Sequence, residues 1–187
     1  MPLYLFLLNG PPKSGKSTLA REALRWFTRK QIDAHPEGFA NPMRAFASSL
    51  LGMPYTSIAK DTRCELLNND TPREMLISLS EAYLRKKYGR EFFGRALLYR
   101  WNSAMVKPIP TVLVMEDSGF EEELISIPRP NTCLVRIMRP GHNYSADSRS
   151  YLTKPDRTLI NDSNLEAAYA KTRDIVDYAI IKWRLML

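Results

Sequence analysis

The chain has 187 residues, 44% of them hydrophobic, which is typical of a single globular domain with one core. It has neither the run of about 18 apolar residues that a membrane span needs nor the basic start of a signal peptide. We therefore expect a cytoplasmic protein. Its 27 Lys and Arg residues outnumber 20 Asp and Glu residues, and the net charge of +7 favours an anionic partner such as a nucleotide or a nucleic acid.

The first predicted element is a strand at residues 3–8, an unbroken apolar run of the kind found in parallel strands buried on both faces. Residues 10–17 follow it and match the phosphate-binding pattern G-x-x-x-x-G-K-[ST] at every fixed position. A helix with apolar residues at helical spacing is predicted at residues 18–30. The order strand, loop, helix is the context in which this pattern indicates a P-loop.

The residue types in this loop suit the binding of ATP with Mg²⁺. Backbone N–H groups at a helix N-terminus converge on phosphate oxygens and add the positive end of the helix dipole. Lys16 is predicted to reach the β- and γ-phosphates as a catalytic residue, and the Ser17 hydroxyl to ligate Mg²⁺. The predicted cofactor-binding residues in the loop are Gly10, Lys13, Ser14, Gly15, Lys16, Ser17 and Thr18.

Helices and loops dominate the next part of the chain. Thr71 and Glu74 form a capping box around a first-turn proline, and Asn41 with Pro42 is interpreted as another helix start. The expected elements are a connection or short strand at 31–39, helices at 41–51, 71–88 and 91–106, and a loop with a short helix at 55–69.

Buried strands return in the second half of the chain. They are predicted at residues 111–115 and 132–138, with a short strand at 158–160 and a long amphipathic helix from a capping box at 163–166 to about residue 183. The polar segment 142–156 is expected to be a mobile loop. Strands separated by helices predict an α/β fold with a parallel sheet flanked by helices on both faces.

Polar residues follow the central apolar strand at Glu116 and Asp117. A P-loop enzyme needs a carboxylate here, either to hold Mg²⁺ through water or to accept a proton from the attacking hydroxyl. We favour Asp117 as both the catalytic and the metal-linked residue, together with Ser17. The structural alternative is that Asp117 or Ser118 caps a short helix beginning near residue 120.

Positive charge gathers on the two central helices and after the strand at 132–138. Arg73 stands in the first turn of a helix, where a cation opposes the dipole, and this placement favours a bound anion. Arg139, with Arg149 and Lys154, is predicted to fold over the phosphates and to neutralise the transferred group. The neighbouring aromatic residues fit either core packing or stacking on a base.

As an ordered set, these motifs resemble the phage deoxynucleoside monophosphate kinases, a group of P-loop kinases. The matching segments are residues 10–17, 39–44, 71–74, the strand ending at 117, 139–141 and 160–166. The resemblance implies one P-loop kinase domain over residues 1–187, with a helical acceptor-binding insertion at about 40–107 and a lid at about 139–156. It also implies that Arg44 and Arg73 line the acceptor site, that Arg139 heads the lid, and that Asn161 and Asp162 lie by the adenine.

The chain departs from that group on the acceptor side. The usual Asp-x-Arg after the central strand is Asp117-Ser118-Gly119 here, and a Leu-Gly-Thr-acid pattern is replaced at residues 79–81. This variant is similar to the 5-hydroxymethyluridine DNA kinase branch, which phosphorylates a base hydroxymethyl group in DNA. The expected acceptor-binding residues are Arg44, Arg73, Glu81, Tyr83, Arg90 and Arg95.

Three functions remain open on the sequence. We favour a kinase that acts on a modified pyrimidine in DNA, because a hydroxyl acceptor needs a base such as Asp117 and a polymer acceptor would use the excess positive charge. A free deoxynucleoside monophosphate kinase is the second hypothesis. A P-loop ATPase module without kinase activity is the third.

Overall fold

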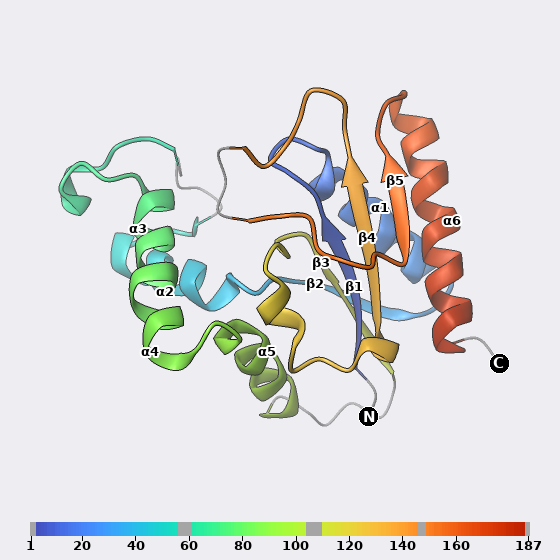
Figure 1. Ribbon diagram of the computed structural model, residues 1–187, viewed down its shortest axis with the longest axis horizontal. Helices are drawn as coiled ribbons and strands as arrows, with labels where there is room; N and C mark the ends of the chain where they lie inside the picture. The colour runs from blue at the N-terminus through green and yellow to red at the C-terminus, as the bar shows by residue number, and fades with distance from the viewer. Residues whose placement is uncertain (1–2, 56–60, 104–109, 146–148, 186–187) are drawn as a thin grey trace.

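The computed structural model describes residues 3–55, 61–103, 110–145 and 149–185, which form a parallel sheet with helices on both faces (Figure 1). The sheet has five strands in the order β2-β3-β1-β4-β5, and every neighbouring pair is parallel. The strands are β1 (Leu3–Asn9), β2 (Asp33–Glu37), β3 (Thr111–Met115), β4 (Thr132–Met138) and β5 (Arg157–Ile160). The expected parallel α/β sheet is confirmed.

Strand β1 lies at the centre of the sheet because its side chains are apolar in both directions. Phe6 and Leu8 belong to the core on one face, whereas Leu5 and Leu7 belong to the core on the other. A strand with this double burial has to be covered by helices on both sides. β2 and β5, which carry more polar residues, form the edges of the sheet.

The two faces are covered by different helices. α1 (Lys16–Arg29) and α6 (Leu165–Trp183) pack together on one face, where Phe27 and Val176 are fully buried. On the other face, α2 (Asn41–Leu51) contributes Met43 and α5 (Phe92–Ser103) contributes Leu97 to the core. Figure 1 shows α2 to α5 gathered beside the sheet, on the side away from α6.

One long helix runs from Pro72 to Tyr88, as expected. Its three parts are α3 (Pro72–Ser78), the π-helical segment η3 (Leu79–Arg85) and α4 (Lys86–Tyr88). The Thr71 side chain accepts a hydrogen bond from the Glu74 amide, so the predicted capping box is confirmed. The π-helical segment was not predicted, and such segments occur often at functional sites.

Three local predictions are wrong. α2 begins at Asn41 itself and Ala40 is the residue before it, so Asn41 is not the cap. Asn164 rather than Ser163 caps α6, since its side chain accepts from the Ala167 amide. The segment predicted as a mobile loop is packed over residues 149–156, where Leu152 is fully buried. The predicted helix end at 104–106 lies outside the described residues.

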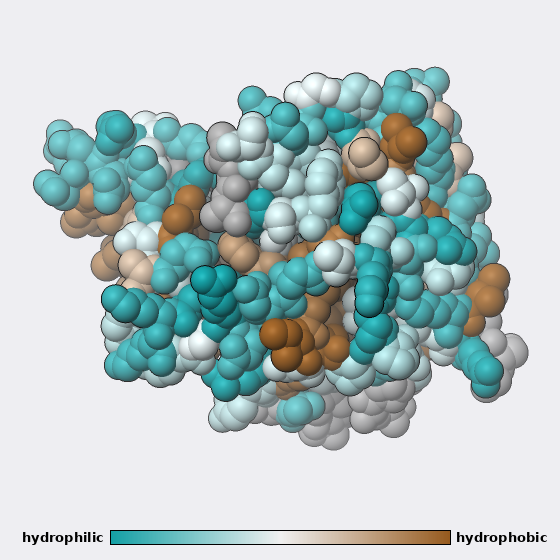
Figure 2. All heavy atoms as spheres, viewed as in Figure 1, coloured by the Kyte–Doolittle hydropathy of each residue, from teal (hydrophilic) through white to brown (hydrophobic). Residues whose placement is uncertain are grey.

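Three short 3₁₀ helices complete the described elements: η2 (Glu65–Leu67), η4 (Glu121–Leu124) and η5 (Arg129–Asn131). No helix in the described ranges is long and apolar enough to cross a membrane. Figure 2 shows a mostly hydrophilic face on which apolar side chains form small, separate groups. Isolated apolar residues of this kind are normal on protein surfaces.

A close approach between α5 and η4 generates a stability prediction. A Cβ atom on Gly94 would collide with the Glu123 carbonyl oxygen. We expect Gly94→Ala to lower the free energy of unfolding by about 1–3 kcal/mol, because packed backbone can separate only at a cost. Denaturant unfolding measures this change, with Asn102→Ala on the exposed side of α5 as the matched control. Equal stability of Gly94→Ala and the wild type would contradict the packing described.

Candidate active site

The P-loop follows β1 at the carboxyl edge of the sheet. Gly10 passes so close to β4 that a Cβ atom there would lie 2.7 Å from the Ile137 carbonyl oxygen. Gly15 has a φ of +99°, which glycine adopts without strain. The Lys16 Nζ donates to the carbonyl oxygens of Gly10 and Pro11 at 2.6 Å each. This lysine therefore lies folded against the loop that a triphosphate would occupy.

Arg139 and Asn161 contact the same loop from two other strands. Arg139, directly after β4, donates to the Lys13 carbonyl at 3.0 Å, and Asn161, directly after β5, donates to the Ser14 carbonyl at 2.9 Å. Both therefore lie at the loop that the sequence analysis assigned to phosphate binding. Asp162 differs, because its exposed carboxylate pairs with Lys171 at 3.2 Å.

Two buried polar atoms near the loop have no hydrogen-bond partner among the described residues, which is consistent with contacts to a bound nucleotide and its metal ion. The Ser14 Oγ is fully buried and has no hydrogen-bond partner within the described part of the chain. Ser17, Arg44 and Glu116 border one cavity of about 360 Å³. Glu116 Oε2, also buried, has no hydrogen-bond partner among the described residues. A hydroxyl and a carboxylate oxygen are ligands of the type that Mg²⁺ prefers.

Glu116 rather than Asp117 therefore lies on the Ser17 side. The sequence predicted Ser17 and Asp117 as a metal pair, but in the structure Asp117 borders a different cavity from Ser17. Consecutive residues at a strand end point to opposite sides, which accounts for the separation. Glu116 thus faces the cavity on the P-loop side, and Asp117 faces the other cavity.

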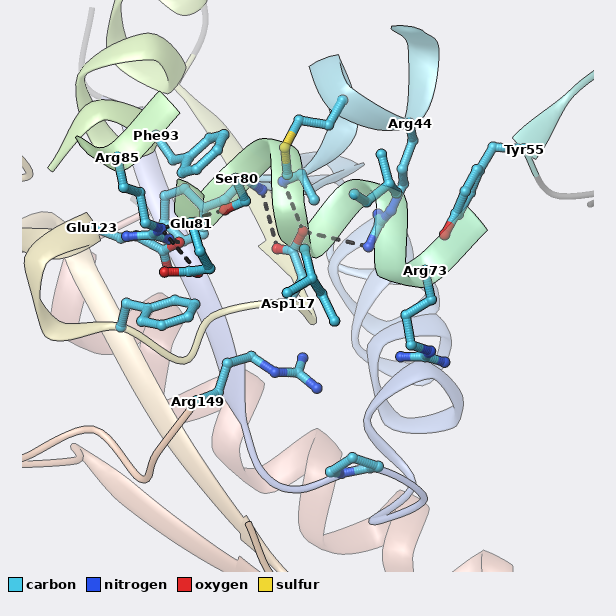
Figure 3. Close-up of a pocket in the computed structure, with 17 residues that line it drawn as sticks. Arg44, Tyr55, Arg73, Ser80, Glu81, Arg85, Phe93, Asp117, Glu123 and Arg149 are labelled. Atoms are coloured by element: carbon cyan, nitrogen blue, oxygen red, sulfur yellow. Dashed lines mark hydrogen bonds and ion pairs between the residues drawn. The ribbon is translucent and has the colours of Figure 1, made fainter. Parts of the chain in front are cut away.

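Asp117 is held by the start of α2. Its carboxylate accepts hydrogen bonds from the amides of Phe39 at 3.1 Å and Ala40 at 3.0 Å, and Arg44 lies 3.6 Å away (Figure 3). Burial raises the pKa of Asp117, although Arg44 and the two amides act in the opposite direction. A carboxylate with a raised pKa is a better proton acceptor than an exposed one.

The alternative role of Asp117 as a cap for the following helix is wrong. η4 is preceded by Phe120, and no side chain caps it with a hydrogen bond. Ser118 does not cap it either, because its hydroxyl donates to the Leu8 carbonyl at 3.2 Å. Asp117 instead binds the N-terminus of α2, a helix distant from it in the sequence.

The cavity that Asp117 borders is an arginine-lined pocket of about 520 Å³. Arg44, Arg73 and Arg149 contribute positive charge from three separate segments (Figure 3). Arg73 pairs with Asp61 at 2.5 Å, and this hydrogen bond raises the pKa of Arg73. The carboxylate of Asp61 therefore supplies the anion that the placement of Arg73 indicated. The other charged and aromatic lining residues include Tyr55, Glu81, Arg85, Phe93, Phe120 and Glu123.

Arg85 and Glu123 form a buried ion pair in the wall of this pocket. Their side chains are 6% and 4% exposed and meet at 2.6 Å. The Arg85 guanidinium also lies between the rings of Phe93 and Phe120. Burial raises the pKa of Glu123 to about 7. Arg85 is thus buried and paired inside the protein, so it is not the surface cation that a DNA backbone would bind.

Three of the six predicted acceptor-binding residues lie outside the pocket. Tyr83 is half exposed and packs edge-on against Tyr88, whereas Arg90 pairs with Glu122 and Arg95 with Glu91. Arg44, Arg73 and Glu81 do border the pocket. Residues two apart on a helix cannot face the same side, which separates Tyr83 from Glu81.

Sequence reasoning missed several residues that the pocket brings together. Ser80 and Arg85, five positions apart, meet through the Arg85 Nε and the Ser80 Oγ at 3.4 Å because the helix is π-helical there. Tyr55 follows α2, and Glu123 lies on the short helix η4, and the sequence indicates the position of neither residue. Arg149 was expected over the phosphates of ATP, yet it borders the arginine-lined pocket.

No family model matches the sequence, and no curated protein matches it significantly. Among solved structures the chain is similar to APE1195, with a TM-score of 0.50 and 14% identity over 96% of this chain and 97% of that one. It is also similar to a mutant of the Mycobacterium tuberculosis APS kinase, with a TM-score of 0.48 and 12% identity over 94% of this chain and 98% of that one.

At these identities the comparisons concern the fold alone. Together with the sheet order and the loop between β1 and α1, the similarity to APE1195 confirms the expected α/β fold, with a parallel sheet, flanking helices and a P-loop after the first strand. The substrates of this chain have to be argued from its own site.

The separation of the two carboxylates makes a prediction about the metal. We expect Glu116→Gln to raise the Mg²⁺ concentration needed for tight ATP binding about 10- to 100-fold, as mutations next to metal ligands typically do. Titration of a fluorescent ATP analogue at stepped Mg²⁺ concentrations measures the effect. Asp117→Asn is the matched control and should leave this Mg²⁺ requirement unchanged. The reverse result would return the metal to Asp117.

Proposed function

We propose that the chain is an ATP-dependent kinase that phosphorylates a deoxynucleotide acceptor in the arginine-lined pocket. The main support for this proposal is the pair of consecutive carboxylates at the end of β3, with Glu116 in the cavity that Ser17 borders and Asp117 in the arginine-lined pocket. Arg44 borders both cavities. This is the layout that a transfer between a bound triphosphate and a neighbouring acceptor requires.

Each polar residue then has a defined role. ATP with Mg²⁺ supplies the phosphoryl group. Lys16, which donates to the Gly10 and Pro11 carbonyls in the structure, would bind the phosphates when ATP is present, and Ser17 and Glu116 would hold the metal ion directly or through water. Asp117 accepts the proton of the attacking hydroxyl, and Arg139 neutralises charge at the transferred group. The backbone amides that hold Asp117 keep its carboxylate oriented before the acceptor arrives.

The leading acceptor is the hydroxymethyl group of 5-hydroxymethyluridine in DNA. The resemblance of Asp117-Ser118-Gly119 to that branch of kinases supports it, and so does the raised pKa of Asp117, which suits removal of a hydroxyl proton. A base in duplex DNA must leave the stack to reach an enzyme pocket, and the cavity of about 520 Å³ beside Asp117 is the pocket proposed to receive it.

The second candidate is a free deoxynucleoside monophosphate. Arg44, Arg73 and Arg149 concentrate positive charge inside the pocket, where one phosphate group would meet them. Arg85, Arg90 and Arg95 are paired with acidic side chains, so they offer less to a DNA backbone than their sequence positions indicated. Both acceptors share the same pocket and the same donor site.

One labelling experiment separates these functions. The protein is incubated with γ-labelled ATP, Mg²⁺ and either hydroxymethyluracil-containing DNA or single deoxynucleoside monophosphates, and the products are digested to nucleosides or resolved as nucleotides. Label on the hydroxymethyl group supports the leading acceptor, and labelled diphosphates support the second. Release of phosphate with neither product would overturn the kinase assignment in favour of an ATPase module.

Two substitutions test the assigned roles. Lys16→Ala should abolish phosphoryl transfer with the fold retained, because the lysine acts on charge that develops in the transition state. Asp117→Asn should lower kcat about 10²–10⁴-fold while the KM for ATP changes little. Steady-state kinetics with circular dichroism as the folding control measure both. Turnover of Lys16→Ala within about tenfold of the wild type would contradict the P-loop role.

A further inference from the structure

The strand-end sequence Asp117-Ser118-Gly119 lacks the arginine that similar kinases carry at its third position, yet the space beside Gly119 is filled by an arginine. A Cβ atom on Gly119 would lie 2.6 Å from Arg149 Cβ and 2.7 Å from its Cγ and Cδ. Such distances are far shorter than van der Waals contact. The Arg149 side chain can therefore lie here only because residue 119 is glycine.

The backbone next to Arg149 is fixed by hydrogen bonds. The Ser150 amide donates to the Gly119 carbonyl at 3.1 Å. Asn9, which is 1% exposed, donates to the Ser150 carbonyl at 3.0 Å and to the Ser118 carbonyl at 3.2 Å. Its Oδ1 accepts from the Leu152 amide at 2.9 Å. One buried side chain thus joins the residue before the P-loop, the end of β3 and the segment that carries Arg149.

Arg149 extends from this fixed backbone into the pocket, toward the space between Asp117 and Arg73 (Figure 3). Its charge lies close enough to Arg73 to act against the positive charge there and lower the pKa of that guanidinium, although Asp61 raises it overall. Arg44, Arg73 and Arg149 thus bring guanidinium groups from three segments of the chain to the lining of one cavity. Guanidinium donors match the geometry of phosphate oxygens, so a phosphate group is the ligand that this lining suits.

We propose that Arg149 is an acceptor-binding residue that binds a phosphate of the acceptor nucleotide, and that Gly119 and Asn9 are the residues that position it. The cation that the strand end lacks is thereby supplied from a segment thirty residues further along the chain. This inference rests on the proposed kinase function and adds a determinant of its specificity: the acceptor carries a phosphate close to the phosphorylated group. Arg149 itself is neither the general base nor a ligand of the metal ion.

The test uses two probes that differ by one phosphate, 5-hydroxymethyldeoxyuridine and its 5′-monophosphate. Direct binding is measured by calorimetry in the absence of ATP. The wild type should bind the monophosphate more tightly than the nucleoside. In Arg149→Gln, which retains much of the side-chain volume, the affinity for the monophosphate should fall about 10- to 100-fold, as loss of a charge-assisted hydrogen bond implies. The affinity for the nucleoside should stay the same.

Gly119→Ala tests the positioning role, since it keeps the charge but displaces the arginine. We expect it to raise the KM for whichever phosphorylated acceptor the wild type uses and to leave the KM for ATP unchanged. In the Arg149→Gln background the same substitution should add little, because the cation is already lost. Arg25→Ala, at an exposed position on α1, is the matched control for loss of one positive charge.

The outcomes separate this inference from the kinase assignment. If the wild type phosphorylates an acceptor and Arg149→Gln leaves both its KM and monophosphate binding at wild-type values, the role of Arg149 is refuted while the kinase function stands. If no acceptor is phosphorylated but monophosphate binding still depends on Arg149, the kinase function fails and the phosphate site stands. Glutamine is smaller than arginine, so Arg149→Gln adds no volume at the tight contact with Gly119. This variant therefore still tests the proposal if Gly119→Ala does not fold.

Discussion

The register between β1 and β3 is the constraint on which the site depends. Leu7 lies opposite Met115, so the two central strands end together, and the P-loop and the carboxylates of Glu116 and Asp117 emerge at the same edge of the sheet. Both faces of these strands pack against helices, so a slip by one residue would exchange the side chains of the two cores and disrupt their close packing. The chemistry at the edge is therefore positioned by apolar packing several residues away.

Asp117 extends this constraint to the helices beside the sheet. By accepting the amides of Phe39 and Ala40, its carboxylate ties the end of β3 to the start of α2, and α2 in turn carries Arg44. A Cβ atom on Gly38 would lie 2.6 Å from Asp117 Oδ2, so the backbone can approach only at a glycine. The residue proposed as the general base is thus also a structural link between the two halves of the site.

The sequence was sufficient to predict the residues of the P-loop, but it was not sufficient to predict which residues line the arginine-lined pocket. The reasons are physical. A P-loop consists of consecutive residues between one strand and one helix, so its pattern is local and Lys16 and Ser17 could be assigned directly. The acceptor pocket joins α2, η3, the end of β3 and residue 149, which no local pattern connects. Alternation shows that Glu116 and Asp117 face opposite sides, but β3 is apolar on both faces, so the sequence does not indicate which residue faces the P-loop.

The distribution of charged residues in the sequence was also insufficient to predict which arginines are available to an anion. The run of basic residues on the central helices indicated a surface for an anionic polymer, yet Arg85 is buried with Glu123, and Arg90 and Arg95 pair with Glu122 and Glu91. Glu122 and Glu123 lie on η4, more than thirty residues from Arg85 and Arg90 in the sequence, so spacing does not indicate these pairs. Glu91, four residues before Arg95, is the partner that spacing does indicate. Conversely, Arg149 lies beside Gly119 and lines the arginine-lined pocket, although thirty residues separate the two in the sequence. The positive charge inside the pocket is therefore set by how the chain folds, and runs of basic residues in the sequence do not indicate where it gathers.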